Sequence, residues 1–246
     1  MRGFADGGGC FPTGVHYPGL AGLVRLRIQG LVAEHDADTS IRDLPIVSID
    51  TETTGRDPDA DRVVEVACVF WRGGQREGER SWLINPGRSI PQEVVDVHGI
   101  SEDDVRDQPQ FGDVAPEILE ALRDYVPLAY NAEFDRKFLH AEMARAGALG
   151  GELPPTVRRN TEWIDPLVWA RELQASEKSR ALGDVCARLG IELTQAHRAT
   201  FDADAALQVL IAFLKDARVP DAYGAFIQEQ RRLAREQDER ARFWRR

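Results

Sequence analysis

Apolar residues in the first part of the central region form short runs rich in β-branched side chains, which are typical of buried strands. Residues 45–50 are one such run, 62–71 a second and 80–86 a third. Gly73 and Gly74 stand between the second and third runs, and two consecutive glycines indicate a tight turn. The pattern therefore predicts three antiparallel strands, each paired with the next.

The second part of the central region has apolar residues at helical spacing, interrupted by two further apolar runs. Helices are expected over five segments: 113–124, 133–147, 166–174, 179–189 and 202–217. The apolar runs at 126–130 and 161–165 predict a fourth and a fifth strand. Three strands followed by alternating helices and strands predict an α/β fold, with a mixed five-stranded sheet flanked by helices on both faces.

The two ends of the chain differ from this centre. Residues 1–43 are interpreted as an N-terminal extension, in which apolar residues from 20 to 31 predict a short helix that packs on the domain rather than a dedicated partner site. Residues 44–219 are the expected domain, and 220–246 a basic helical C-terminal tail. In that tail Arg232 lies four residues before Glu236, which favours a solvated helix over a surface that grips nucleic acid or a partner.

The composition is that of an ordinary soluble protein. The chain has 246 residues, of which 43% are hydrophobic and 29% charged. It has no apolar run of about 18 residues and no apolar signal-peptide core, so we expect no membrane contact and no secretion. The three cysteines, Cys10, Cys68 and Cys186, form no CxxC pair. This pattern argues against a disulfide framework or a zinc site and favours a cytoplasmic location.

The negative charge is concentrated in the centre of the chain. The net charge is −10, and residues 44–226 carry 20 basic and 32 acidic side chains. Such a body argues against a broad surface for duplex nucleic acid. It leaves room for a small site in which metal ions supply the positive charge.

Two acids stand at the end of the first predicted strand. Asp50 and Glu52 are separated by one residue, and residues i and i+2 of a strand point to the same face. Two carboxylates held so close raise each other's pKa unless a cation lies between them. The pair therefore predicts a cation site.

A divalent cation that prefers oxygen takes about six or more ligands, so further acids are needed. Asp135 lies in the first turns of a predicted helix that follows a strand, and Asp202 at the start of another helix, for which Thr200 is a plausible N-cap. His197 lies five residues before Asp202, on the preceding loop. Each has a structural alternative, because acids in a first helical turn interact favourably with the helix dipole.

Taken together and in this order, these residues carry a family resemblance. Three segments resemble the motifs of the DEDDh (DnaQ-like) 3′–5′ exonucleases, the group of the DNA polymerase III epsilon proofreading subunit: SIDTETTG at 48–55, YNAEFD at 130–135 and HRATFDADAA at 197–206. Weaker similarity fills 85–101, 163–171 and 181–192. Tyr130 and Thr200 depart from the family, which often has His and Leu at these positions.

The resemblance implies a ribonuclease H-like fold with its acids at one edge of the sheet, and two Mg²⁺ or Mn²⁺ ions as cofactors. By analogy, Asp50 bridges both ions, Glu52 and Asp202 complete the first site, and Asp135 serves the second. His197 is the expected general base, which takes a proton from the attacking water.

The same resemblance nominates residues that bind the terminal nucleotide. They are the turn formed by Thr53, Thr54 and Gly55, whose backbone can approach a sugar, and Phe138, whose ring offers a stacking face. His98 is a further candidate, for which a structural role is an equal alternative.

The sequence thus predicts a metal-dependent 3′–5′ exonuclease that releases nucleoside monophosphates from single-stranded DNA 3′ ends. One alternative keeps this chemistry but acts on RNA 3′ ends, since the 2′-hydroxyl is recognised by details of the pocket. Another is a non-catalytic polymerase accessory module, which the complete set of acids disfavours. No short interaction motif supports a polymerase partner, and repair, proofreading and RNA processing all remain open.

Overall fold

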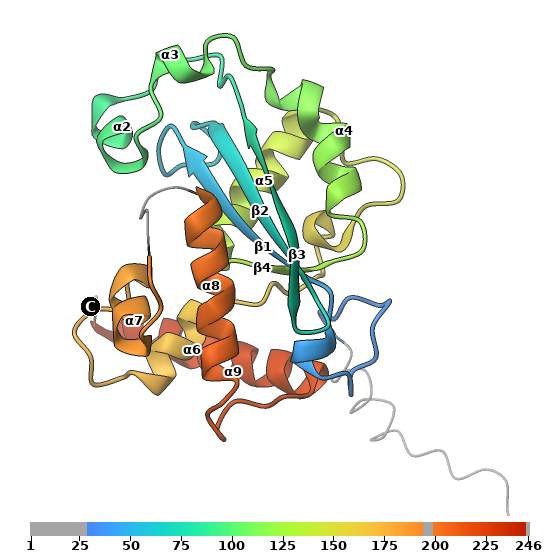
Figure 1. Ribbon diagram of the computed structural model, residues 1–246, viewed down its shortest axis with the longest axis vertical. Helices are drawn as coiled ribbons and strands as arrows, with labels where there is room; N and C mark the ends of the chain where they lie inside the picture. The colour runs from blue at the N-terminus through green and yellow to red at the C-terminus, as the bar shows by residue number, and fades with distance from the viewer. Residues whose placement is uncertain (1–28, 194–198, 245–246) are drawn as a thin grey trace, which may run out of the picture.

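The computed structural model describes residues 29–193 and 199–244, which are built around one mixed sheet (Figure 1). Its strands are β1 (Ile46–Thr53), β2 (Val63–Arg72), β3 (Gln75–Leu83) and β4 (Val126–Leu128), in the order β3-β2-β1-β4. β1 pairs antiparallel with β2 and parallel with β4, and β2 pairs antiparallel with β3. The predicted mixed α/β architecture is therefore confirmed.

The described sheet has four strands, so the predicted fifth strand at 161–165 is wrong. Only Ile164 pairs, in a single parallel bridge to Leu128. Its N–H donates to the carbonyl of Pro127 at 2.9 Å, and its carbonyl accepts from the N–H of Ala129 at 3.1 Å. The pairing stops there because Pro166 begins the helix α6 (Pro166–Leu173) two residues later.

The hairpin between β2 and β3 forms at the predicted glycines. Gly73 and Gly74 have φ of +56° and +78°, and they allow Arg72 to pair with Gln75 across a two-residue turn. β3 begins at Gln75 rather than at residue 80 as predicted. Its first part is an exposed edge strand, so the pairing with β2 fixes its start and no apolar alternation marks it.

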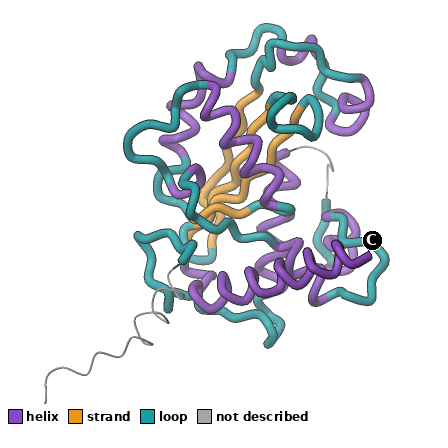
Figure 2. Tube along the Cα trace, turned by 180° about the vertical axis from the view of Figure 1, so that it is seen from behind, coloured by secondary structure: helices purple, strands orange, loops and turns teal. Residues whose placement is uncertain are grey.

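Helices cover both faces of the sheet (Figures 1 and 2). One face packs against α4 (Phe111–Ala121) and α5 (Ala132–Arg145), and the other against α8 (Ala199–Phe213). Beside α8 lie α6, α7 (Leu182–Leu189) and the long α9 (Tyr223–Trp244). Two short helices that the sequence did not predict, α2 (Gln92–His98) and α3 (Glu102–Val105), lie at the opposite end from α9, and η1 (Ile41–Asp43) and η2 (Pro155–Val157) are single turns.

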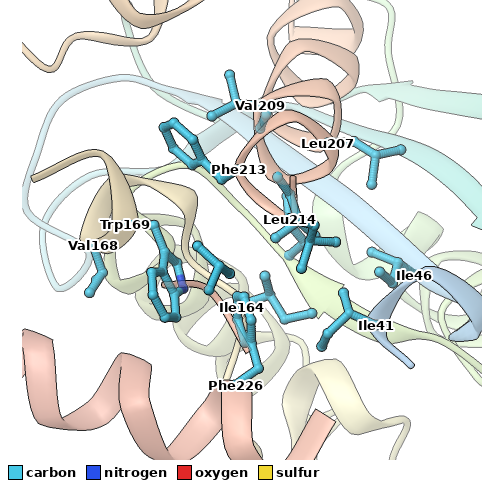
Figure 3. Close-up of a cluster of buried hydrophobic side chains, with 14 of the residues drawn as sticks. Ile41, Ile46, Ile164, Val168, Trp169, Leu207, Val209, Phe213, Leu214 and Phe226 are labelled. Atoms are coloured by element: carbon cyan, nitrogen blue, oxygen red, sulfur yellow. The ribbon is translucent and has the colours of Figure 1, made fainter. Parts of the chain in front are cut away.

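The core on the α8 face joins the described parts of both chain ends to the sheet (Figure 3). Trp169 of α6 packs on Phe226 of α9 with ring centroids 4.9 Å apart. Phe226 is fully buried, whereas Phe243 near the end of α9 is 73% exposed. The solvated helix predicted for the tail is therefore wrong for the first part of α9. Arg232 does pair with Glu236 as predicted.

Three other expectations concern parts of the chain away from the sheet. The predicted helix at 20–31 lies mostly outside the described residues. Cys68 and Cys186 are buried free thiols, and Cys10 is outside the described range. Among the described helices, none is both long enough and apolar enough to cross a membrane.

Candidate active site

Three carboxylates meet at the end of β1. Alternation along the strand directs Asp50 and Glu52 to the face that α8 covers, the same face as Ile46. Asp202 lies in the first turn of α8 and faces this pair. One oxygen of each carboxylate lies within 4.8 Å of the other two, and all three side chains are half-buried. The structure thus brings together three of the four predicted acids.

The fourth acid approaches β1 from the opposite face. Asp135, in the first turn of α5, is only 3% exposed. Its Oδ1 accepts two hydrogen bonds from Thr51, one from the backbone N–H at 3.0 Å and one from the hydroxyl at 2.8 Å. Asp135 is outside the group of three, but its charge is close enough to raise the pKa of Asp50. The four acids therefore surround the end of a single strand.

Burial, and then mutual repulsion, raises the pKa values of three of these acids. Burial, followed by the charges of Asp135, Glu52 and Asp202, raises the pKa of Asp50 well above its ordinary value. Burial and the neighbouring carboxylates, Glu65 first, raise the pKa of Glu52 to about 8. Burial also raises the pKa of Asp135, against the lowering effect of its hydrogen bonds from Thr51. A cation between these groups would favour their charged forms.

Glu65 is a neighbour that the predicted site did not include. It lies on β2 directly opposite Glu52, and its carboxylate accepts a hydrogen bond from the Ser81 hydroxyl. The register between the two strands places it there. A sequence signal existed only in the predicted pairing of residues 45–50 with 62–71.

Asp165 positions the helix that carries Asp135. Its carboxylate caps α6 by accepting from the N–H of Leu167 at 2.9 Å, and it also accepts from the N–H groups of Asn131 at 3.0 Å and Ala132 at 3.1 Å. Asn131 has φ of +69°, a conformation that non-glycine residues seldom adopt. Asp165 thereby fixes the first turn of α5. The sequence signal for Asp165 was only its place in the weakly similar segment 163–171.

The turn after β1 is held by its own hydrogen bonds. Thr53 and Thr54 are buried, and Thr54 accepts from the N–H of Arg62 at 3.0 Å. A Cβ on Gly55 would lie 2.2 Å from the carboxylate of Asp61. The glycine at this position is therefore required by Asp61, a reason other than the close approach of a sugar.

His98 lies against the same turn and is 6% exposed. Its Nδ1 accepts from the N–H of Ile100 at 3.0 Å, and its ring faces the backbone of Thr53. Burial lowers its pKa. These contacts favour the structural alternative, in which His98 supports the turn.

Phe138 is fully buried in the core under α5, although it also contributes to the wall of a cavity along this helix, so its predicted stacking role stays a prediction. Phe134, one helical turn earlier and half-buried, packs on it with centroids 4.8 Å apart. Phe134 is therefore the aromatic ring that remains accessible next to Asp135. The sequence signal for it was only its place in the YNAEFD segment.

Two predictions concern the start of α8. His197 lies within 194–198, outside the described residues, so its predicted role stays a prediction. The helix begins at Ala199, which places Thr200 inside the first turn instead of at the N-cap.

Comparison with known proteins identifies a nuclease family over the segment that contains the four acids. The family model described as exonuclease, RNase_T, matches residues 47–210. Relatives include the PolC-type DNA polymerase III of Bacillus cereus, 31% identical over 185 residues, and that of Thermotoga maritima, 31% identical over 188 residues. These matches cover 75% and 76% of this chain but only 12% and 13% of the relatives, so the chain spans a small part of their length.

Solved structures match most of the described chain. Exonuclease X in complex with 5′ overhanging duplex DNA has a TM-score of 0.56 and 26% identity, covering 74% of this chain and 99% of that one. The nuclease domain of 3′hExo, a DEDDh family member bound to rAMP, has a TM-score of 0.60 and 16% identity, covering 73% and 96%. E. coli exonuclease I with a dT13 oligonucleotide has a TM-score of 0.60 and 20% identity, covering 72% and 42%.

Proposed function

This chain belongs to the DnaQ-like exonuclease family, and we propose that it is a 3′–5′ exonuclease that acts on single-stranded DNA and releases nucleoside monophosphates. The observation that carries the proposal is the carboxylate cluster: Asp50, Glu52 and Asp202 on one face of β1, with Asp135 beside them from the other face. The raised pKa values of Asp50, Glu52 and Asp135 show that gathering these acids around one strand end has an electrostatic cost to the folded chain.

The donor set fits hard divalent cations. The described cluster offers only carboxylate oxygens, which suit Mg²⁺ or Mn²⁺ better than zinc. Asp50, Glu52 and Asp202 would hold one ion, and Asp50 with Asp135 would hold a second. When bound, two such ions supply the positive charge that lowers the pKa of water and offsets the charge on the reacting phosphate.

Other side chains would position Asp135, stack on the substrate and accept a proton. Thr51 keeps Asp135 in place through two hydrogen bonds, and Asp165 fixes the helix turn from which Asp135 extends. The half-exposed ring of Phe134 would stack on the terminal base. His197 would take the proton from the attacking water, the role that the family resemblance gives it.

A digestion experiment tests this function. The protein is incubated with matched 5′-labelled single-stranded DNA and RNA oligonucleotides in Mg²⁺, in Mn²⁺ and in EDTA. We expect a ladder that shortens from the 3′ end, requires metal and forms faster on DNA. Asp50→Asn should abolish it, whereas Asp204→Asn, a matched acid two residues after Asp202 on α8, should retain it.

Two other outcomes would change the proposed function. Faster digestion of RNA would make the protein an exoribonuclease with the same site. No cleavage of either substrate by folded protein with metal would reject the enzyme and favour the accessory module.

A further inference from the structure

A cavity of about 920 Å³ lies along α5, the helix that carries Asp135. Its walls are α5, the loop that follows β1 at residues 56–59, and the segment 156–159 after the start of η2. Phe134 lines the cavity and directly precedes Asp135 in the chain. The cavity therefore follows the helix that carries Asp135, and its wall includes the chain neighbour of that acid.

The charge of this cavity is opposite to that of the whole chain. Five arginine or lysine side chains and three carboxylates line it, although the chain carries a net charge of −10. The carboxylate of Glu133 is neutralised by ion pairs with Arg136 at 2.6 Å and Lys137 at 3.2 Å. Arg56 and Arg159 form no ion pair within the described ranges, and both are exposed. Arg158 pairs with Glu34 at 2.8 Å, so Arg56 and Arg159 are the lining arginines without an ion pair among the described residues, and Asp57 and Asp59 lie in the same wall.

Other side chains of the cavity agree with a site for anions. The pKa of His140 is lowered, first by burial and then by the charges of Arg159 and Arg136. Thr156 also lines the cavity, and its buried hydroxyl has no hydrogen-bond partner among the described residues. A positive groove with an aromatic ring at one end is the combination by which proteins follow a single nucleic acid strand without reading its sequence.

We propose that this cavity holds the substrate strand on the 5′ side of the scissile bond, and that Arg56 and Arg159 bind its phosphate groups. The inference rests on the proposed nuclease function and assigns a binding path that the carboxylate cluster lacks. Metal ions on the four acids would offset charge only at the reacting phosphate, so the phosphate groups further along the strand need positive charge elsewhere. The occupant is a single strand, since the acidic body offers no broad surface for a duplex.

The test separates strand binding from chemistry. Kd is measured by fluorescence anisotropy for a 5′-fluorescein oligothymidylate of about 12 nucleotides, with Ca²⁺ and at several salt concentrations. The double variant Arg56→Ala/Arg159→Ala is compared with the control Arg80→Ala/Arg235→Ala, which removes two exposed arginines elsewhere. Hydrolysis of thymidine 5′-monophosphate p-nitrophenyl ester, which has no upstream phosphates, is measured in parallel.

We expect the groove variant to raise Kd about ten-fold and to reduce the slope of log K against log salt by about two. Its hydrolysis of the ester should be unchanged, and the control variant should bind as the wild type does. Asp59→Asn, which removes a negative charge from the same cavity, should bind the strand more tightly.

Two results would overturn the proposed strand path. One is a wild-type Kd and salt slope in Arg56→Ala/Arg159→Ala, and the other is an equal loss of affinity in the control variant. Ester hydrolysis reports on the proposed function separately. A wild type that leaves both ester and oligonucleotide intact would reject the nuclease, and a selective loss of binding in the groove variant would still support the strand path.

Discussion

Thr51 and Asp135 are joined by two hydrogen bonds that both end on Oδ1 of the carboxylate, at 3.0 Å from the backbone N–H and 2.8 Å from the hydroxyl. Thr51 lies between Asp50 and Glu52 on β1, and its side chain points to the opposite face of the sheet. One residue therefore fixes the position of α5 relative to the two acids on the α8 face. The geometry of the acid cluster depends on this contact.

Thr51→Val removes the hydroxyl donor and keeps the β-branched shape. Because a hydrogen bond to a charged group contributes about 1.5–3 kcal/mol, we expect kcat on single-stranded DNA to fall about ten-fold or more. Ser48→Ala is the matched control, since that buried hydroxyl on the same strand has no partner among the described residues. Full activity in Thr51→Val would show that the contact does not position Asp135 for catalysis.

The raised pKa values of Asp50, Glu52 and Asp135 predict that stability without metal falls as pH rises. Aspartate and glutamate titrate near pH 4 in unfolded chains, whereas Glu52 titrates near pH 8 in the fold. Between these values the folded state binds more protons than the unfolded state, so raising the pH lowers the free energy of unfolding. In EDTA we expect a lower Tm at about pH 8.5 than at about pH 7, a window above the histidine titrations.

Asp50→Asn is the control for this pH effect. Removing one charge should raise the Tm at the alkaline end and reduce its dependence on pH, while abolishing hydrolysis. Differential scanning fluorimetry across this range measures both quantities. The electrostatic explanation is wrong if Tm falls by the same amount in the wild type and in Asp50→Asn between the two pH values.

Glu142 ties α5 to the start of β2. Its carboxylate is 1% exposed and receives hydrogen bonds from Arg62 at 2.6 and 2.9 Å and from the N–H of Val63 at 3.3 Å. Glu142→Ala leaves these donors without their acceptor. Because Arg62 is partly exposed and can rehydrate, the cost stays at the low end for a broken buried pair. We expect the free energy of unfolding, measured by urea denaturation, to fall by about 3 kcal/mol.

Glu120→Ala gives the comparison for Glu142, because Glu120 pairs with Arg123 on the exposed surface of α4. Glu120→Ala should lower the free energy of unfolding by no more than about 0.5 kcal/mol. Equal costs for the two variants would contradict the role assigned to the buried pair.

Asp165→Ala removes the acceptor of three backbone N–H groups, two of them at the start of α5. We expect the free energy of unfolding to fall by about 2 kcal/mol and kcat to fall as well, because the turn that carries Asp135 loses its anchor. Asp113→Ala, which removes a cap from α4, should lower stability by about 1 kcal/mol and leave kcat unchanged. A kcat unchanged in Asp165→Ala would make that residue a helix cap and nothing more.

The sequence by itself determined the local features of this protein. Strand alternation places Asp50 and Glu52 on one face, two glycines make the β2–β3 turn, and apolar spacing gives the main helices. These features depend on neighbours a few residues apart, which a pattern records directly. The order of the three motifs was enough to indicate the family.

Tertiary structure decided which groups meet and which surfaces stay open. Asp202 and Asp135 reach opposite faces of β1, and Phe138 is buried while Phe134 remains accessible, because helices from distant parts of the chain pack on both faces of the sheet. The short pairing at Ile164 and the anchoring role of Asp165 follow from the same packing. Contacts between residues far apart in the chain leave no periodic trace in the sequence, so only the folded arrangement reveals them.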